Sequence, residues 1–75
     1  MIWSRIGGPG RMFTVDANGR LYGLSPDSSS VWRYNGHPHD PLNWEKIGGP
    51  ALAIFGAWKT VLAMNPQTKE VWMLV

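Results

Sequence analysis

The chain carries few side chains that could perform catalysis. A serine nucleophile needs a positioned histidine base, but His37 and His39 lie in one loop, and the serines at 28–30 form a turn without a nucleophile-elbow motif. The five acidic residues all lie in or beside predicted turns, so nothing fixes the carboxylate pair that glycoside cleavage requires. The absence of cysteine excludes thiol catalysis and thiolate metal sites. We therefore expect no enzyme activity and no cofactor.

One group of side chains has metal-binding character. His37, His39 and Asp40 lie in the segment GHPHDPLN, and alternate residues of an extended loop face the same way. The prolines around them also suit an exposed loop, in which such side chains are simply solvated. We interpret them in this second way and predict no metal site.

The aromatic residues are more informative than the ionisable ones. Four of the five tryptophans recur at matched positions, Trp3 with Trp44 and Trp32 with Trp72. Such recurrence indicates packing between repeated units. Trp58 is different, because it falls at a predicted hairpin tip where the first half of the chain has Ala17 and Asn18. A tryptophan exposed at a turn predicts a binding or interface role.

A sugar is the ligand that these side chains would suit. Its C–H faces stack on aromatic rings, and its hydroxyl groups bond short polar side chains. We predict carbohydrate sites in clefts between adjacent units, lined by Trp58, Tyr22, Tyr34, Arg33 and Asn65. Several equivalent sites on one assembly would multiply a weak single-site affinity by avidity.

The elements that position these aromatic and polar side chains follow from an internal sequence repeat. The motif WSRIGGP at residues 3–9 returns as WEKIGGP at residues 44–50, an offset of 41, and the Val-Trp pair at 31–32 returns at 71–72, an offset of 40. One residue of slippage in a turn reconciles the two offsets. A period in the forties is typical of repeat architectures, whose units bury their apolar faces only against neighbours. We divide the single domain, residues 1–75, into a first repeat at about 3–43 and a second at about 44–75.

Alternating apolar and polar residues between turn signals predict short strands and no helix. The predicted strands cover residues 1–6, 11–15, 20–24, 31–35, 44–47, 52–56, 60–64 and 70–75. The Asn18-Gly19 pair predicts a type I′ hairpin between the second and third of them. Four antiparallel strands per repeat of about forty residues indicate an all-β fold of β-propeller blades, two per chain. A β-sandwich is the competing architecture, although it gives no reason for the recurring motif.

Several segments resemble tectonin-type propeller repeats, a group of fungal, invertebrate and bacterial lectins. The resemblance rests on the two WxxIGGP motifs together with RLYGLSP, VWRYNG, VLAMNP and EVW, and it covers nearly the whole chain. It departs where FGAWK replaces TVDANG. The resemblance implies carbohydrate binding. It also implies that the Trp-x-x-Ile-Gly-Gly strand is outermost in its blade and that the strand after GGP begins the next blade at the centre.

On this mapping, residues 2–6 form an outer strand without a blade, and residues 52–75 form a blade without an outer strand. The apolar edge EVWMLV would be prone to aggregation if left uncovered. Pairing it with the N-terminal strand of another copy resolves both defects, and a head-to-tail contact that closes gives a ring. We expect a homo-oligomer, with a trimer of six blades favoured by the resemblance. Two alternatives stay open, namely a piece of a longer polypeptide and a minimal or engineered assembly unit without a ligand.

Bulk properties exclude other partners. The formal net charge is +2, and the seven Lys and Arg residues form no run, so we expect no nucleic-acid binding. The N-terminus lacks the long apolar run of a signal peptide, and no stretch approaches the ~20 apolar residues of a membrane span. We expect a soluble protein that does not insert into membranes. A core of this size rarely supplies more than about 3–5 kcal/mol, which again favours oligomerisation.

Overall fold

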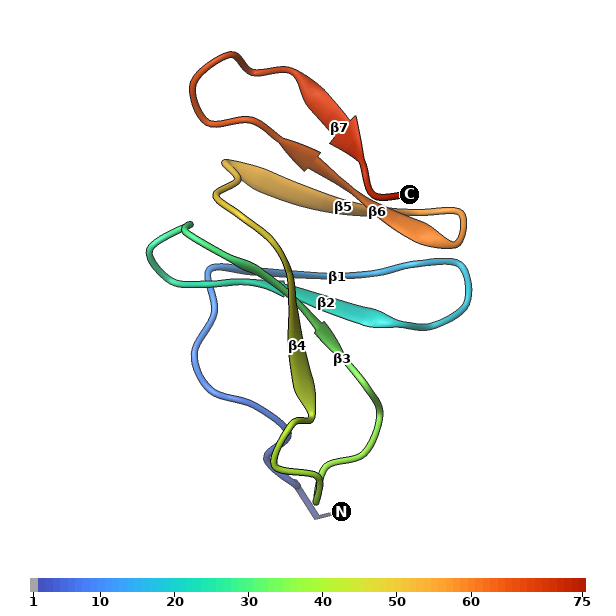
Figure 1. Ribbon diagram of the computed structural model, residues 1–75. Coiled ribbons are helices and arrows are strands. Elements are labelled where there is room, and N and C mark those ends of the chain that lie inside the picture. The colour runs from blue at the N-terminus through green and yellow to red at the C-terminus, as the bar shows by residue number, and fades with distance from the viewer. Residues whose placement is uncertain (1) are drawn as a thin grey trace.

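The protein is all-β, and the part of the chain that is described forms seven strands in two antiparallel sheets (Figure 1). The computed structural model describes residues 2–75, and these residues contain no helix, hence none that could cross a membrane. Sheet A has the order β1 (Met12–Val15), β2 (Leu21–Leu24), β3 (Val31–Tyr34) and β4 (Trp44–Gly48). Sheet B has the order β5 (Ala53–Ala57), β6 (Thr60–Met64) and β7 (Val71–Met73). The chain therefore runs as two meanders, residues 12–48 and 53–73, and the last strand of the first meander, β4, comes from the start of the second predicted repeat.

Seven of the predicted strands are confirmed with small shifts at their ends, but the strand predicted over residues 1–6 is not formed. Met1 lies outside the described residues, and residues 2–10 belong to neither sheet. A strand needs a neighbour for its backbone groups, and this segment instead folds against Trp44. The indole Nε1 of Trp44 donates to the Ile6 carbonyl at 2.9 Å, and Asn43 Nδ2 donates to the same oxygen at 3.4 Å.

The two first hairpins of the repeats differ by one residue, which locates the slippage between the repeat offsets. Val15 pairs with Leu21 across the β1–β2 hairpin with five residues between them, whereas the equivalent pair of the β5–β6 hairpin, Gly56 with Val61, encloses four. The predicted type I′ turn is wrong, because only Gly19 of its two central residues has a positive φ, of 81°. The Gly19 amide donates to the Asp16 carbonyl at 3.0 Å. The loop is therefore a turn over residues 16–19 that ends in a left-handed glycine.

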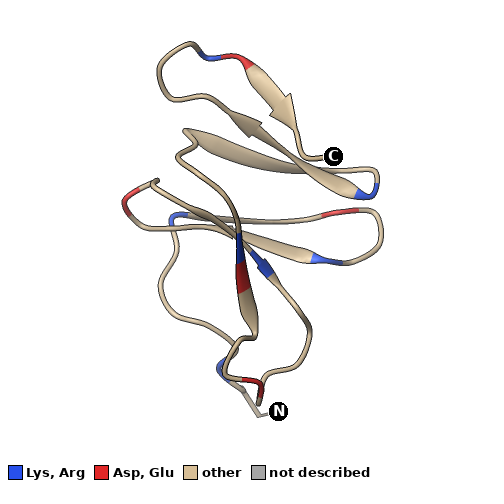
Figure 2. Ribbon diagram, in the orientation of Figure 1, with Lys and Arg blue, Asp and Glu red and all other residues tan. Residues whose placement is uncertain are grey.

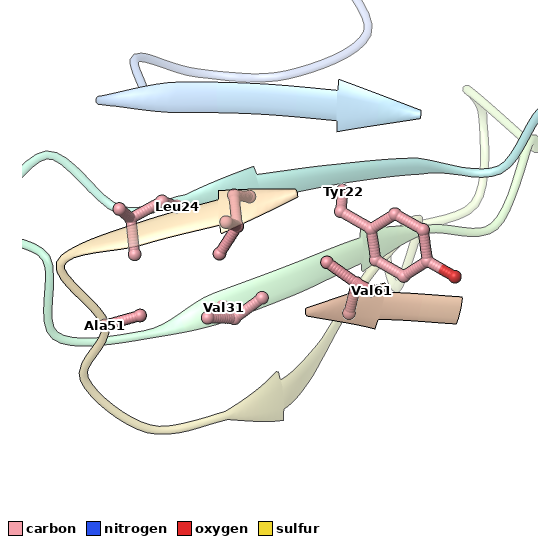
Figure 3. Packing of buried hydrophobic residues seen from close by; sticks show 6 residues of the cluster. Tyr22, Leu24, Val31, Ala51 and Val61 are labelled. Carbon is pink, nitrogen blue, oxygen red and sulfur yellow. The ribbon is translucent and has the colours of Figure 1, made fainter. Parts of the chain in front are cut away.

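The hydrophobic core lies between the two sheets (Figure 3). It contains six buried residues from both meanders and the segment that joins them: Tyr22, Leu24, Val31, Ala51, Ile54 and Val61. Strands β1 and β5 approach most closely, where the Gly56 amide donates to Thr14 Oγ1 at 2.8 Å. A Cβ at Gly56 would lie 2.0 Å from the Val15 carbonyl oxygen, so only glycine fits there.

Each sheet also has a free apolar face opposite the core. Successive side chains of a strand point to opposite faces, so Phe13 and Val15 of β1 point away from the residues that contact β5. On sheet B the corresponding free face carries Phe55, Val71 and Met73. Phe13 is 51% exposed and Val71 57% exposed, and the other three are exposed as well. The segment before β1 lies against part of the free face of sheet A, at Phe13 and Trp44, and the exposed apolar residues leave the rest of both free faces open to solvent.

Candidate functional site

A buried carboxylate organises the β1–β2 hairpin. The Asp16 side chain accepts hydrogen bonds from the Asn18 and Arg20 amides at 2.9 and 3.0 Å, from Arg20 Nε at 2.9 Å and from the Tyr22 hydroxyl at 2.8 Å. Burial alone would raise the pKa of Asp16, but these hydrogen bonds outweigh it and lower the pKa to about 2. Burial and the bond to Asp16 raise the pKa of Tyr22. Each of these side chains has a hydrogen-bond partner, so the network holds the hairpin.

The hairpin tip of β5–β6 docks on this network through its backbone. The Ala17 amide donates to the Trp58 carbonyl at 2.6 Å, and the Arg20 guanidinium donates to the Lys59 carbonyl. Trp58 itself has a positive φ of 49° and is 70% exposed. In Figure 2 the charged residues of these two hairpins lie together at one end of the molecule. Trp58 thus combines a backbone role in joining the sheets with a side chain that faces solvent.

Two further predicted ligand residues lie next to each other on β3. Arg33 forms an ion pair with Glu45 on β4, with 2.8 Å between Nη2 and Oε1. Tyr34 packs on Trp44, with ring centroids 5.1 Å apart. Since neighbouring residues of a strand point to opposite faces, Arg33 lies on the side of sheet A that faces sheet B, and Tyr34 lies on its free face.

The last two predicted ligand residues are engaged inside the protein. Tyr22 is 1% exposed and belongs to the core, with its hydroxyl on Asp16. Asn65 holds the β6–β7 turn, because its Oδ1 accepts from the Gln67 and Thr68 amides at 2.8 and 3.0 Å. The five predicted residues therefore do not converge on one site: Trp58 and Asn65 lie at opposite ends of β6.

Two clefts occupy matched positions in the repeats. The first, here the Trp44 cleft, has a volume of about 300 Å³ and is lined by Arg5, Ile6, Gly7, Gly8, Phe13, Leu21 and Trp44. The second, the Trp72 cleft, has a volume of about 180 Å³ and is lined by Val31, Ile47, Gly48, Val61, Ala63, Trp72, Met73 and Leu74. The repeat offsets and the strand register relate three lining residues of each cleft, because Ile6, Gly7 and Leu21 correspond to Ile47, Gly48 and Val61. Each cleft thus lies between the Ile-Gly pair of one motif and the second strand of the following meander.

The two clefts differ in their walls. The Trp44 cleft is bounded by an indole and by the cationic side chain of Arg5, whose Nε donates to the Gly7 carbonyl at 3.0 Å. The Trp72 cleft holds an indole that is 62% exposed, and its lining residues are otherwise apolar. An aromatic wall beside a guanidinium can hold a ring with C–H faces and hydroxyl groups. The sequence signal for both clefts is the Ile-Gly pair of the WxxIGGP motif.

A third cleft lies on the free face of sheet A. It has a volume of about 300 Å³, and its lining includes Phe13, Gly23, Leu24, Trp32 and Trp44. Phe13 and Trp44 pack at 6.4 Å between ring centroids. The lining is almost wholly apolar, which suits another protein surface better than a hydroxylated ligand.

Residues 2–75 hold no group of three His, Asp or Glu side chains close enough to bind a metal ion. His37, His39 and Asp40 are all exposed in the β3–β4 connection. Comparisons of the chain with protein-family models and with curated proteins found no match, so the clefts and the faces of the sheets carry the functional argument.

Proposed function

We propose that the protein is a carbohydrate-binding, homo-oligomeric β-propeller whose equivalent sites lie between neighbouring blades. The single observation that carries this proposal is the recurrence of a cleft at matched positions of the two repeats, in each case with an indole in its lining, Trp44 from β4 in one and Trp72 from β7 in the other. A repeated cleft is what a multivalent binder of glycans needs, since several weak sites on one assembly act together. The tectonin-like motifs support the same function. Three chains and six blades remain the favoured assembly.

In this proposal, the Trp44 cleft contributes stacking from its indole and hydrogen bonds from Arg5. Tyr34 extends the aromatic wall, because its ring packs on Trp44. Arg33 and Trp58 are proposed contacts at the edges of neighbouring clefts, where their side chains reach solvent. Tyr22 and Asn65 act indirectly, by holding the hairpin and the turn that frame these positions.

A glycan array tests the proposal, with methylated sugars among its ligands. The matched variants are Arg5→Ala, in the Trp44 cleft, and Arg11→Ala, an exposed arginine that lines none of the three clefts. A hydrogen bond to a charged group contributes about 1.5–3 kcal/mol, so R5A should weaken binding by roughly tenfold or more. R11A should bind as the unmodified protein does. Binding of no glycan above background would reject the proposal.

A second candidate is an assembly unit without a ligand. The observation that favours it is the pair of free apolar faces, with Phe13 and Val15 on sheet A and Val71 and Met73 on sheet B. Both candidates predict an oligomer, and native mass spectrometry measures its copy number. They differ in the glycan array, where the assembly unit gives no signal at any concentration at which it is assembled.

A further inference from the structure

The free edge of β7 and the unpaired segment at residues 2–7 are complementary. Strand β7 pairs only with β6 among the described residues, so its other edge presents backbone groups without a ladder partner. Trp72 and Met73 of this edge are exposed. Residues 2–7 lie outside both sheets, and Trp3 is 90% exposed. Figure 1 places the segment before β1 and strand β7 at opposite ends of the molecule, so one chain cannot join residues 3–7 to β7 in this fold.

Sheet A contains a template for the missing contact. Its outermost pair joins β3, which begins Val-Trp, to β4, which begins Trp-Glu-Lys-Ile-Gly. Strand β7 also begins Val-Trp, and residues 3–7 read Trp-Ser-Arg-Ile-Gly. Both halves of the β3–β4 pair are thus duplicated in the chain, but only one pair is assembled. We propose that residues 3–7 of one copy add to the free edge of β7 of a second copy as its fourth strand.

The template fixes the register of this pairing. Strands β3 and β4 pair Val31 with Gly48, Trp32 with Lys46, Arg33 with Glu45 and Tyr34 with Trp44, with a bulge between Val31 and Trp32. An offset of 40 relates β3 to β7, and an offset of 41 relates β4 to residues 3–7. The equivalent pairs are therefore Val71 with Gly7, Trp72 with Arg5, Met73 with Ser4 and Leu74 with Trp3, where the second residue of each pair belongs to the second copy. Arg33 and Glu45 lie directly opposite each other, and their side chains form an ion pair at 2.8 Å on one face of sheet A. The corresponding residues, Met73 and Ser4 of the second copy, should therefore also lie on one face of the extended sheet B.

The same pairing completes the Trp72 cleft. In the chain, Trp44 stands on the outermost strand of sheet A and donates from Nε1 to the Ile6 carbonyl of the preceding motif. The equivalent contact for sheet B runs from Trp3 of the second copy to the carbonyl of Ile47, which lines the Trp72 cleft. The second copy thus supplies the indole wall that Trp44 supplies to the first cleft. This role of the cleft rests on the proposed function, whereas the strand pairing does not.

The free faces support a second copy as the occupant. The face of sheet B that carries Val71 and Met73 corresponds, by register, to the face of sheet A that carries Val31 and Arg33 and meets sheet B. The free face of sheet A, with Phe13, corresponds to the face of sheet B that carries the buried Ile54. Each free face therefore matches the inner face of the other sheet. Such a head-to-tail contact uses two different surfaces and propagates until it closes.

Disulfide cross-linking tests the register, and the natural absence of cysteine keeps the experiment clean. Directly opposite residues of antiparallel strands have Cα atoms about 4.5–5.5 Å apart, which a disulfide can span. A chain with Ser4→Cys, mixed and refolded with a chain with Met73→Cys, should give a covalent dimer under mild oxidation. The matched control replaces Met73→Cys by Val71→Cys, which lies on the same strand and face but two residues out of register. That pair should cross-link at least tenfold more slowly.

The outcomes separate the inference from the proposed function. Equal cross-linking of both pairs, or no cross-linking of S4C with M73C, would overturn the proposed pairing, whatever the protein binds. If these variants do not fold, hydrogen exchange of the unmodified protein decides: protection of residues 3–6 must appear with oligomerisation, and unprotected amides in an oligomer would overturn it. In the doubly substituted S4C/M73C ring, Trp3→Ala should lower the number of glycan sites per chain from two to one. A cross-linked ring without any glycan binding would reject the sugar and retain the pairing.

Discussion

Gly56→Ala should be among the most damaging single substitutions in this protein, although it adds only one methyl group. Gly56 lies where β5 crosses closest to β1, and its added Cβ would be 2.0 Å from the Val15 carbonyl oxygen and 2.5 Å from the Val15 carbonyl carbon. Both atoms belong to the backbone, so neither can rotate out of the way. The two sheets must move apart to admit the methyl group.

The cost has two parts. Overpacking that shifts the backbone costs about 1–3 kcal/mol. Separating the strands also breaks the bond from the Gly56 amide to Thr14 Oγ1, which contributes about 1 kcal/mol. The expected loss is about 2–4 kcal/mol, against a total stability of roughly 4–11 kcal/mol for a chain of this length. The substitution should therefore lower the melting temperature by roughly 8–32 °C or prevent folding.

Gly49→Ala is the matched control, because nothing lies within 4 Å of its added Cβ and its φ is not positive. Urea unfolding followed by tryptophan fluorescence, at one fixed protein concentration, gives the free energy of unfolding of both variants. Fixed concentration matters because association adds to apparent stability. The reasoning about the close contact of β1 and β5 fails if G56A unfolds within about 0.5 kcal/mol of G49A, the usual range for a neutral surface substitution.

The pKa of Asp16 is lowered to about 2 from 3.8, so its network stabilises the fold fully above about pH 4 and loses this contribution as the pH falls through about 2. Hydrogen bonds from Ser29 and Ser25 lower the pKa of Asp27 as well. Asp16→Asn should therefore remove part of the pH dependence of the free energy of urea unfolding at acid pH, and D16N/D27N should remove more of it. An unchanged pH profile in the double variant would contradict this. Thr14→Val should cost about 1 kcal/mol in the same assay, by leaving the Gly56 amide without its acceptor, and no loss would show that water replaces the hydroxyl. Trp58→Ala should weaken glycan binding and leave the mass of the assembly unchanged, since Trp58 bonds the first hairpin through its carbonyl while its side chain is largely exposed. A smaller assembly in native mass spectrometry would assign the indole to an interface.

Strand positions and turns were predictable from the sequence because local chemistry decides them. The motif Gly-Gly-Pro, the Asn18-Gly19 pair and alternation within each segment located seven strands to within one or two residues. The strand predicted at residues 1–6 failed for a physical reason, since alternation describes side chains while a strand also needs a backbone partner. Among the described residues, 2–6 pair with no strand of either sheet. The hairpin type failed because Asn-Gly also fits a longer loop in which glycine alone is left-handed.

The orientation of side chains was harder to predict than the strands. Two-residue periodicity shows that Tyr22 shares a face with Leu24. It does not show which face meets sheet B, because that depends on the packing of residues about forty positions apart in the sequence. Its aromatic ring and hydroxyl therefore suggested a ligand contact, whereas the hydroxyl holds Asp16. Asp16 itself resembled an ordinary turn residue. Its partners Arg20 and Tyr22 lie across the hairpin, so their convergence on one carboxylate depended on a loop length that the sequence left open.

The tight approach at Gly56 has a consequence for any closed assembly. In the first repeat its position belongs to Val15, which carries the Cβ that Gly56 lacks. In a ring, the gap between the two sheets of one chain and the gap between sheets of neighbouring chains would therefore differ in width near the axis. Narrow and wide gaps between neighbouring sheets would alternate around such a ring. The order of its rotational symmetry would therefore equal the number of chains and not the number of sheets.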